Sequence, residues 1–400
     1  MNKLLNFECA CIQGTYWMVY SIVSSFASVF LLSRNYSNTE IGIILAVANV
    51  VAVILQPLAA DLADRSKRFT VIGLSQIMTI IMMVMTVGLF SLQGKSLGLA
   101  VIFVLLIAWH TALQPLINSL NFKLQESGVH INFGVARSMG SLAYSILTAI
   151  LGTLVEHYGV QTLPVSGEIV MLMLLFSLFL TRKQYLKVRA VNAEKGLIET
   201  KNREEDAEEI TLTDFIRRNK VFFAINIGVV GVYFSNSVLN NYMMQIVADV
   251  GGDSEDMGRV LAVMAFLEIP TMVCFDALRK RFSCQLMLKV AAVGFTAKIF
   301  MCYMATSVTM IFAAHLLQLV SFALFLPAMV HFIDEIMSKG EAVKGQALYT
   351  MMITVTTIFS SLVGGAILDF SGAKMLTLVA TVATAIGAVI IIATVDKVKR

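Results

Sequence analysis

Long apolar stretches alternate with short polar ones along most of the chain. A transmembrane helix needs about 20 mainly apolar residues, and stretches of this length predict twelve spans, six on either side of one long polar break. The first six cover residues 14–32, 41–60, 70–91, 97–120, 133–155 and 163–181. The other six cover residues 222–246, 258–275, 286–306, 309–336, 347–368 and 376–395. Because short turns join most of them, we expect neighbouring helices to run antiparallel.

The two halves of the chain repeat one pattern. Gly42 begins an apolar stretch that passes through Pro57 to a basic cluster, and Gly258 begins a similar stretch that passes through Pro270. A parallel repeat of this kind places equivalent helices at equivalent positions of two bundles. The sequence therefore predicts an all-α integral membrane protein, with twelve transmembrane helices in two pseudo-symmetric six-helix bundles.

The polar break sets the predicted domain boundaries. We expect an N-terminal bundle over residues 1–181, a cytoplasmic linker over 182–220 and a C-terminal bundle over 221–400. Lys and Arg gather in the loops that share a side with both chain ends, which predicts that both termini are cytoplasmic. We expect the protein to lie in the cell membrane and to cross it many times.

Composition supports a lipid environment. Of the 400 residues, 58% are hydrophobic and only 14% are charged, which is too little charge for a soluble chain of this length. The net charge of +4 gives no indication of nucleic-acid binding. The five cysteines have no metal-binding spacing, and catalytic motifs and nucleotide-binding loops are missing from the sequence, so we expect neither a metal nor a cofactor and no enzyme.

Glu268 and Lys298 are charged residues deep inside predicted spans. Glu268 is in the middle of the eighth span, at the position where the early copy of the repeat has Ala52, and Lys298 lies deep in the ninth. Charges at this depth are costly unless they face a partner, a cavity or a proton. We interpret Glu268 as a proton carrier and Lys298 as its counter-charge; a permanent ion pair that only fixes packing is the alternative.

Polar side chains at helical spacing mark further candidate contacts. A planar guanidinium such as that of Arg137 suits neighbouring hydroxyl groups or a carboxylate, although at its depth it could also snorkel to the headgroups. Amide, hydroxyl and aromatic side chains on other spans would suit a polyhydroxylated solute or a nucleoside, but could equally serve helix packing. These candidates are Tyr16, Tyr20, His110, Asn118, Asn236, His315 and Gln318.

Residues 60–68, Ala-Asp-Leu-Ala-Asp-Arg-Ser-Lys-Arg, follow the second predicted span. They resemble the G-x-L-A-D-R-x-G-R signature of the major facilitator superfamily, with Ala60 and Lys67 in place of its two glycines. The resemblance extends over essentially the whole chain. It implies that Asp64, Arg65 and Arg68 act in a conformational latch.

A narrower resemblance begins at residues 133–140. This segment is similar to one in the lactose permease-like oligosaccharide:proton symporters, where an arginine binds sugar. Glu268 and Lys298 resemble the acidic and basic intramembrane positions of that branch. His315 or Gln318 can be aligned with its helix-ten histidine, but its second acidic residue is absent here. The resemblance implies that Arg137 and Gln318 contact substrate and that His315 joins in proton coupling.

These observations predict a secondary active transporter that works by alternating access and takes up a small hydrophilic solute together with protons. A sugar or oligosaccharide is the first expectation. A nucleoside or aromatic-acid symporter, a drug or metabolite exporter and a non-transporting receptor are the alternatives. We expect the solute, the coupling proton and the lipid bilayer as partners, no nucleic acid, and a monomer. Sodium coupling and the direction of transport stay open at this point.

Overall fold

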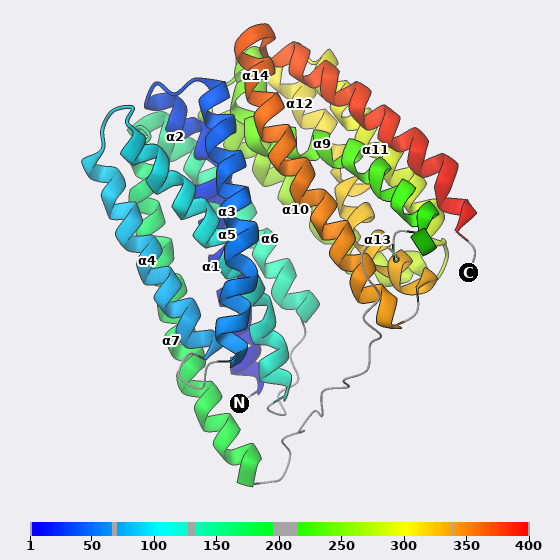
Figure 1. Cartoon of the computed structure of the whole chain (residues 1–400). Helices are drawn as coiled ribbons and strands as arrows, with labels where there is room; N and C mark the ends of the chain where they lie inside the picture. The colour runs from blue at the N-terminus through cyan, green and yellow to red at the C-terminus, as the bar shows by residue number, and fades with distance from the viewer. Residues whose placement is uncertain are drawn as a thin grey trace. The chain divides into compact units, whose positions relative to one another are not determined.

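The computed structural model describes residues 2–65, 70–126, 133–194, 215, 217–337 and 339–398. Its elements are all helical (Figure 1). In the first part of the chain they are α1 (Asn2–Tyr20), η1 (Ser21–Ser25), α2 (Ala27–Ser33), α3 (Asn38–Arg65), α4 (Val71–Ser91), α5 (Leu97–Glu126), α6 (Phe133–Tyr158) and α7 (Thr162–Glu194). In the second part they are α9 (Lys220–Asp249), α10 (Ser254–Arg279), α11 (Cys284–Met304), α12 (Val308–His315), η2 (Leu316–Leu319), α13 (Phe322–Ile336), α14 (Lys339–Thr394) and η3 (Val395–Lys397).

The predicted all-helical membrane fold is confirmed. Among the described residues, eleven helices are long and apolar enough to cross a membrane. The last of them, Glu341–Lys397, contains both of the final predicted spans. Within it α14 bends at Gly372, whose φ of 79° is a left-handed conformation that glycine adopts without strain. The last two spans are therefore joined through this bend and not by a separate loop.

Three predicted helices differ in detail from the structure. The first begins at Asn2 and contains a π-helical turn, η1, before it continues as α2. The sixth continues beyond its predicted end at residue 181, since α7 runs to Glu194. The tenth was expected to be continuous over residues 309–336, but the structure divides it into α12, the 3-10 turn η2 and α13.

The described chain forms two compact units. The first consists of Met1–Tyr36 and Ile44–Arg203, and the second of Ser37–Ile43 and Glu204–Arg400. In the first unit α1 packs along α6 and α7, while α4 packs along α5 and α7. Small residues let α1 approach α6 closely, because a Cβ atom on Gly14 would lie 3.3 Å from the Cβ of Ala143.

In the second unit α9 packs along α14 (Figure 1). Glycines bring the two backbones together: a Cβ on Gly231 would lie 2.5 Å from the carbonyl oxygen of Ala383, and one on Gly387 would lie 2.5 Å from that of Gly228. Close contact through small residues is a main way in which membrane helices associate, because burial of apolar surface gains little in lipid. These glycines are therefore structural.

The second unit also contains the first turn of α3. The carboxylate of Asp369 on α14 accepts hydrogen bonds from the backbone N–H groups of Asn38, at 3.0 Å, and Thr39, at 2.7 Å. The side-chain amide of Asn38 donates to the same carboxylate at 2.9 Å. A carboxylate at the start of a helix satisfies N–H groups that have no partner within the helix and complements the helix dipole.

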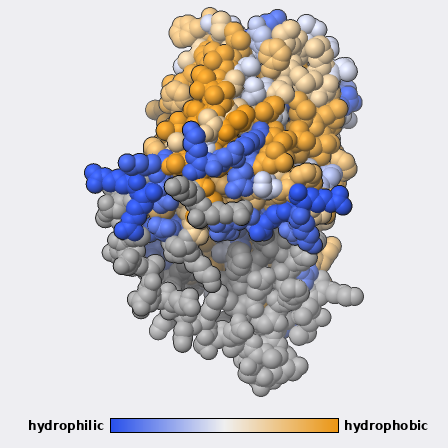
Figure 2. Space-filling model, turned by 90° about the vertical axis from the view of Figure 1, so that its right-hand side faces the viewer, coloured by the Kyte–Doolittle hydropathy of each residue, from blue (hydrophilic) through white to orange (hydrophobic). Residues whose placement is uncertain are grey.

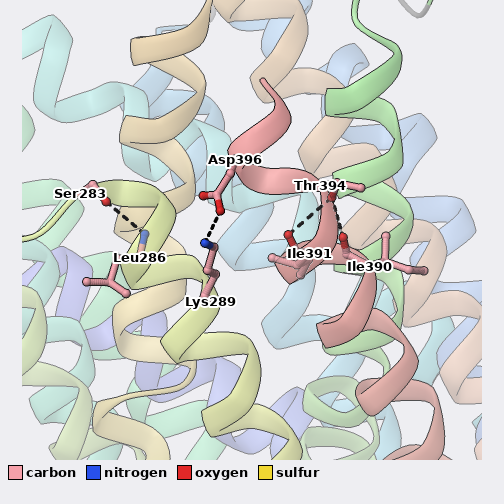
Figure 3. A network of polar contacts seen from close by, with 7 residues as sticks. All are labelled: Ser283, Leu286, Lys289, Ile390, Ile391, Thr394 and Asp396. Carbon is pink, nitrogen blue, oxygen red and sulfur yellow. Dashed lines mark hydrogen bonds and ion pairs between the residues drawn. The ribbon is translucent and has the colours of Figure 1, made fainter. Parts of the chain in front are cut away.

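The surface has the character expected of a membrane protein. Figure 2 shows hydrophobic side chains gathered in a band and bordered by hydrophilic ones. Exposed apolar residues of the second unit include Val273, Phe300 and Val389. Figure 3 shows a polar network of this unit, in which Lys289 of α11 pairs with Asp396 of η3. In the same network, the Leu286 N–H donates to the hydroxyl of the helix cap Ser283 at 3.2 Å.

The glycine contact between α9 and α14 gives a stability prediction. Gly387→Ala places a methyl group against the backbone of α9, and overpacking of this kind costs about 1–3 kcal/mol. We expect a lower unfolding temperature for the purified variant in detergent. Gly94→Ala is the control, since nothing lies within 4 Å of a Cβ at that position. If both variants unfold at the wild-type temperature, the result contradicts close backbone contact between α9 and α14 at Gly387.

Candidate functional site

A chain of hydrogen bonds crosses the interior of the second unit. The ammonium group of Lys298, on α11, donates to Oε1 of Gln318 at 2.8 Å. The amide nitrogen of Gln318 donates in turn to Oε1 of Glu268, on α10, at 2.9 Å. Lys298 is fully buried, Gln318 is 1% exposed and Glu268 is 9% exposed. One neutral amide thus joins the two charges that the sequence places inside the membrane.

The interruption of helix ten positions this amide. Gln318 lies in η2, between α12 and α13. A Cβ on Gly294 of α11 would lie 3.0 Å from the carbonyl oxygen of Val320, so the absence of a side chain there lets the turn approach. Such a turn leaves carbonyl groups without their helical partners. The hydroxyl of Thr271 on α10 donates to one of them, that of Leu319, at 3.0 Å.

His315 lies one turn before Gln318 and is fully buried. Its Nδ1 lies 2.8 Å from the carbonyl oxygen of Ile311, which fits a neutral imidazole that donates through Nδ1. No described residue offers Nε2 a hydrogen-bond partner. In this tautomer Nε2 is a buried acceptor within the same region as the charged pair. It could take up a proton or accept a hydrogen bond from a solute.

In the first unit, aromatic and polar side chains gather between α1 and α5. The rings of Tyr16 and His110 are stacked with centroids 4.4 Å apart, and Tyr20 lies 5.9 Å from the same imidazole. The Nε2 of His110 lies 3.3 Å from the carbonyl oxygen of Tyr16, and Nδ1 has no hydrogen-bond partner among the described residues. Further along α5, Asn118 accepts a hydrogen bond from Gln13 at 3.3 Å.

Arg137, on α6, belongs to this group as well. The Cζ atom of its guanidinium lies 4.1 Å from the ring centroid of Trp17, on α1. Its Nη1 donates to the hydroxyl of Ser141 at 3.3 Å. The structure thus brings Arg137 together with the aromatic residues of helix one.

Two further residues of the first unit were not selected from the sequence. The hydroxyls of Ser25 and Tyr144 are hydrogen-bonded at 2.8 Å, and both side chains are buried. Ser25 ends the π-helical turn η1. Turns of this kind are common at functional sites, but sequence gives no signal for them. The spacing of Arg137 and Tyr144, seven residues apart on one helix, is the only hint that Tyr144 shares its face.

Other candidates are placed only in part. Asn236 is buried on α9, in the second unit. Asp64 and Arg65 lie at the end of α3, but their side chains are outside the part of the chain that the structure describes, and Arg68 is outside it altogether. The latch assigned to these three residues stays a prediction. Within the described ranges, no cluster of His, Cys, Asp and Glu could hold a metal ion.

Comparison with known proteins supports the fold. A sequence model of the MFS_1 like family matches residues 10–379. No curated protein sequence matches the chain. Among solved structures, the chain is similar to the nucleoside transporter NupG, with a TM-score of 0.76 and 14% identity over 99% of each chain.

Two other solved structures are also similar. The POT family transporter PepTSo gives a TM-score of 0.70 and 11% identity over 98% of each chain. A bacterial homolog to the human lysosomal transporter Spinster gives a TM-score of 0.64 and 14% identity, over 99% of this chain and 97% of that one. The chain therefore has the major facilitator fold.

The bridging amide gives a second stability prediction. Gln318→Leu leaves Lys298 and Glu268 without their shared partner, and an unsatisfied buried polar group costs about 1–3 kcal/mol. We expect the variant to unfold at a clearly lower temperature in detergent. The matched control is Gln346→Leu, which removes one hydrogen bond at an exposed site, to the carbonyl of Val330. Equal unfolding temperatures for the two variants would contradict the hydrogen bonds by which Gln318 joins Lys298 and Glu268.

Proposed function

Since the chain belongs to the MFS_1 like family, we propose that it is a secondary active transporter that couples proton entry to uptake of a small hydrophilic solute. A sugar or oligosaccharide is the proposed substrate class. The observation that carries the proposal is the buried series Glu268, Gln318, Lys298, because ionisable residues inside a membrane are costly and typically mark substrate or ion pathways.

The bridge suggests how a proton could change the site. In the ionised state, the carboxylate of Glu268 accepts from Gln318, while the oxygen of Gln318 accepts from Lys298. Protonation of Glu268 removes the negative charge that balances Lys298. The neutral carboxyl group then carries an O–H that can donate a hydrogen bond. The amide of Gln318 can then turn towards a solute, because it carries both a donor and an acceptor. His315, with its open Nε2, is the proposed second proton site.

The first unit supplies most of the proposed solute contacts. Arg137, His110 and Asn118 offer hydrogen-bond donors and acceptors, and Tyr16 and Tyr20 offer aromatic rings. Asn236 and Gln318 are the proposed contacts of the second unit. We propose transport by alternating access, in which Asp64, Arg65 and Arg68 stabilise one of the two states. The protein would act as a monomer in the cell membrane with both termini in the cytoplasm.

A nucleoside is the second candidate substrate. Two observations favour it: the aromatic residues Tyr16, Trp17, Tyr20 and Tyr144 gather near His110, and the fold is similar to that of a nucleoside transporter. Aromatic faces bind the planar base as readily as they bind the apolar face of a sugar. The lactose permease-like branch, which the sequence resembles, favours the sugar.

Proton coupling through Glu268 can be tested by external pH. Bacterial cells that lack their own sugar and nucleoside permeases would produce the protein, and de-energised suspensions would receive lactose, raffinose, uridine or adenosine. We expect one solute to make the medium more alkaline with the wild type, because protons enter with it. Glu268→Gln should abolish this change but retain exchange of labelled solute across the membrane, which needs no net proton movement.

Glu255→Gln is the matched control, because Glu255 lies in the first turn of the same helix, far along the chain from Glu268, and pairs with Arg259. It should behave as the wild type. Alkalinisation that persists in Glu268→Gln would remove the carrier role from Glu268. No response to any of the four solutes, with the protein detected in the membrane, would count against proton-coupled uptake and favour export or sodium coupling.

A further inference from the structure

The side chain of Arg137 extends along α6 towards the interior of the span. This residue lies about one turn into α6, near the start of the span that the sequence predicts over residues 133–155. Side chains of an α-helix lean towards its N-terminus, which at this position would carry the guanidinium out towards the membrane surface. The Nη1 atom instead reaches the hydroxyl of Ser141, one turn further into the span. Contacts at this depth oppose the snorkelling of the charge to the headgroups.

Trp17 supplies one such contact. The guanidinium carbon lies 4.1 Å from the centre of the indole ring, within the range of a cation–π interaction, which is strongest away from water. The indole itself is fixed from two sides. It lies edge-on to Tyr16, with centroids 5.5 Å apart, and to Tyr20, at 5.2 Å. The ring therefore has little freedom to follow the arginine outwards.

Gly140 makes room for the indole. A Cβ atom at this position would lie 2.5 Å from Cδ1 of Trp17 and 3.2 Å from both Cγ and Nε1. Real side chains do not approach so closely, so even an alanine would displace the ring. Gly140 is one helical turn from Arg137, on the same helix and beside the same ring. The glycine, the indole and the guanidinium thus form one packed group in the first unit.

We propose that Trp17 and Gly140 are positioning residues for Arg137: Gly140 lets the indole lie against α6, and the indole holds the guanidinium inside the span. Arg137 is thereby available to a solute within the membrane and not to lipid headgroups. The consequence for solute binding rests on the proposed function. The position of the guanidinium does not, and it can be measured without knowing the substrate.

Chemical modification of arginine tests the position directly. Membranes that contain the full chain would be treated with phenylglyoxal, and modification of Arg137 followed over time by peptide mass spectrometry, with the exposed Arg217 as internal reference. We expect Arg137 to react slowly in the wild type. In Trp17→Leu and in Gly140→Ala it should react about tenfold faster, as expected when a desolvated cation–π contact is lost. Trp17→Phe keeps an aromatic face and should stay close to the wild type.

The control is Trp109→Leu, which removes the other tryptophan of the chain, on α5. It should leave the reactivity of Arg137 unchanged. Should Trp17→Leu react no faster than the wild type, the proposal is overturned. It is also overturned if Trp17→Phe reacts as fast as Trp17→Leu, because an aromatic face would then not be what holds the charge. If Gly140→Ala fails to fold, the two Trp17 variants still test whether the indole positions Arg137.

Uptake of labelled lactose separates this proposal from the proposed function. If the wild type takes up lactose, Trp17→Leu should raise its KM and leave the maximal rate nearly unchanged, and Trp17→Phe should restore the KM. An unchanged KM in Trp17→Leu contradicts a role in solute binding. If the wild type takes up no lactose, that result counts against the sugar in the proposed function, and the labelling of Arg137 still decides whether Trp17 and Gly140 position it.

Discussion

Placing an ammonium group and a carboxylate inside a lipid-embedded bundle constrains the whole interior of the second unit. Lys298 and Glu268 come from different helices, and a glutamine side chain from a third joins them. To bring Gln318 to that point, helix ten gives up its regular hydrogen bonds over one turn. Gly294 and Thr271, on the two helices that carry the charges, then accommodate that turn. The irregular backbone follows from the charges.

The two units repeat one helical pattern but bury different polar side chains. Where the second carries Glu268, the first has the buried Ala52, and its buried polar groups include Glu8, Arg34, His110 and several hydroxyls. Buried histidines occur in both: His110 and His315 are each fully buried with one ring nitrogen bonded to a backbone carbonyl. The proposed function accordingly assigns proton coupling to the second unit and draws its solute contacts from both.

Sequence predicts this fold well because a span depends mainly on length and apolar character, which are local. It also identifies Glu268, Lys298 and Arg137, because charged residues stand out in an apolar stretch. It does not predict the contacts between them. The turn at Gln318 depends on Gly294 and Thr271, which lie in other helices, and the place of Trp17 depends on Gly140. These features depend on which side chains come into contact after folding. Such contacts between distant residues cannot be read from a single sequence.

The π-helical turn Ser21–Ser25 changes how helix one is to be aligned with other chains. Such a turn holds one residue more than an α-helical turn, so it shifts all later side chains by about 100° around the axis. A related protein without the turn would be one residue shorter here, and a gap-free alignment would match residues of different helix faces after Ser25. For the same reason, deleting one residue from this turn would keep the helix but redirect Ser25 away from Tyr144, a change of geometry that no single substitution can imitate.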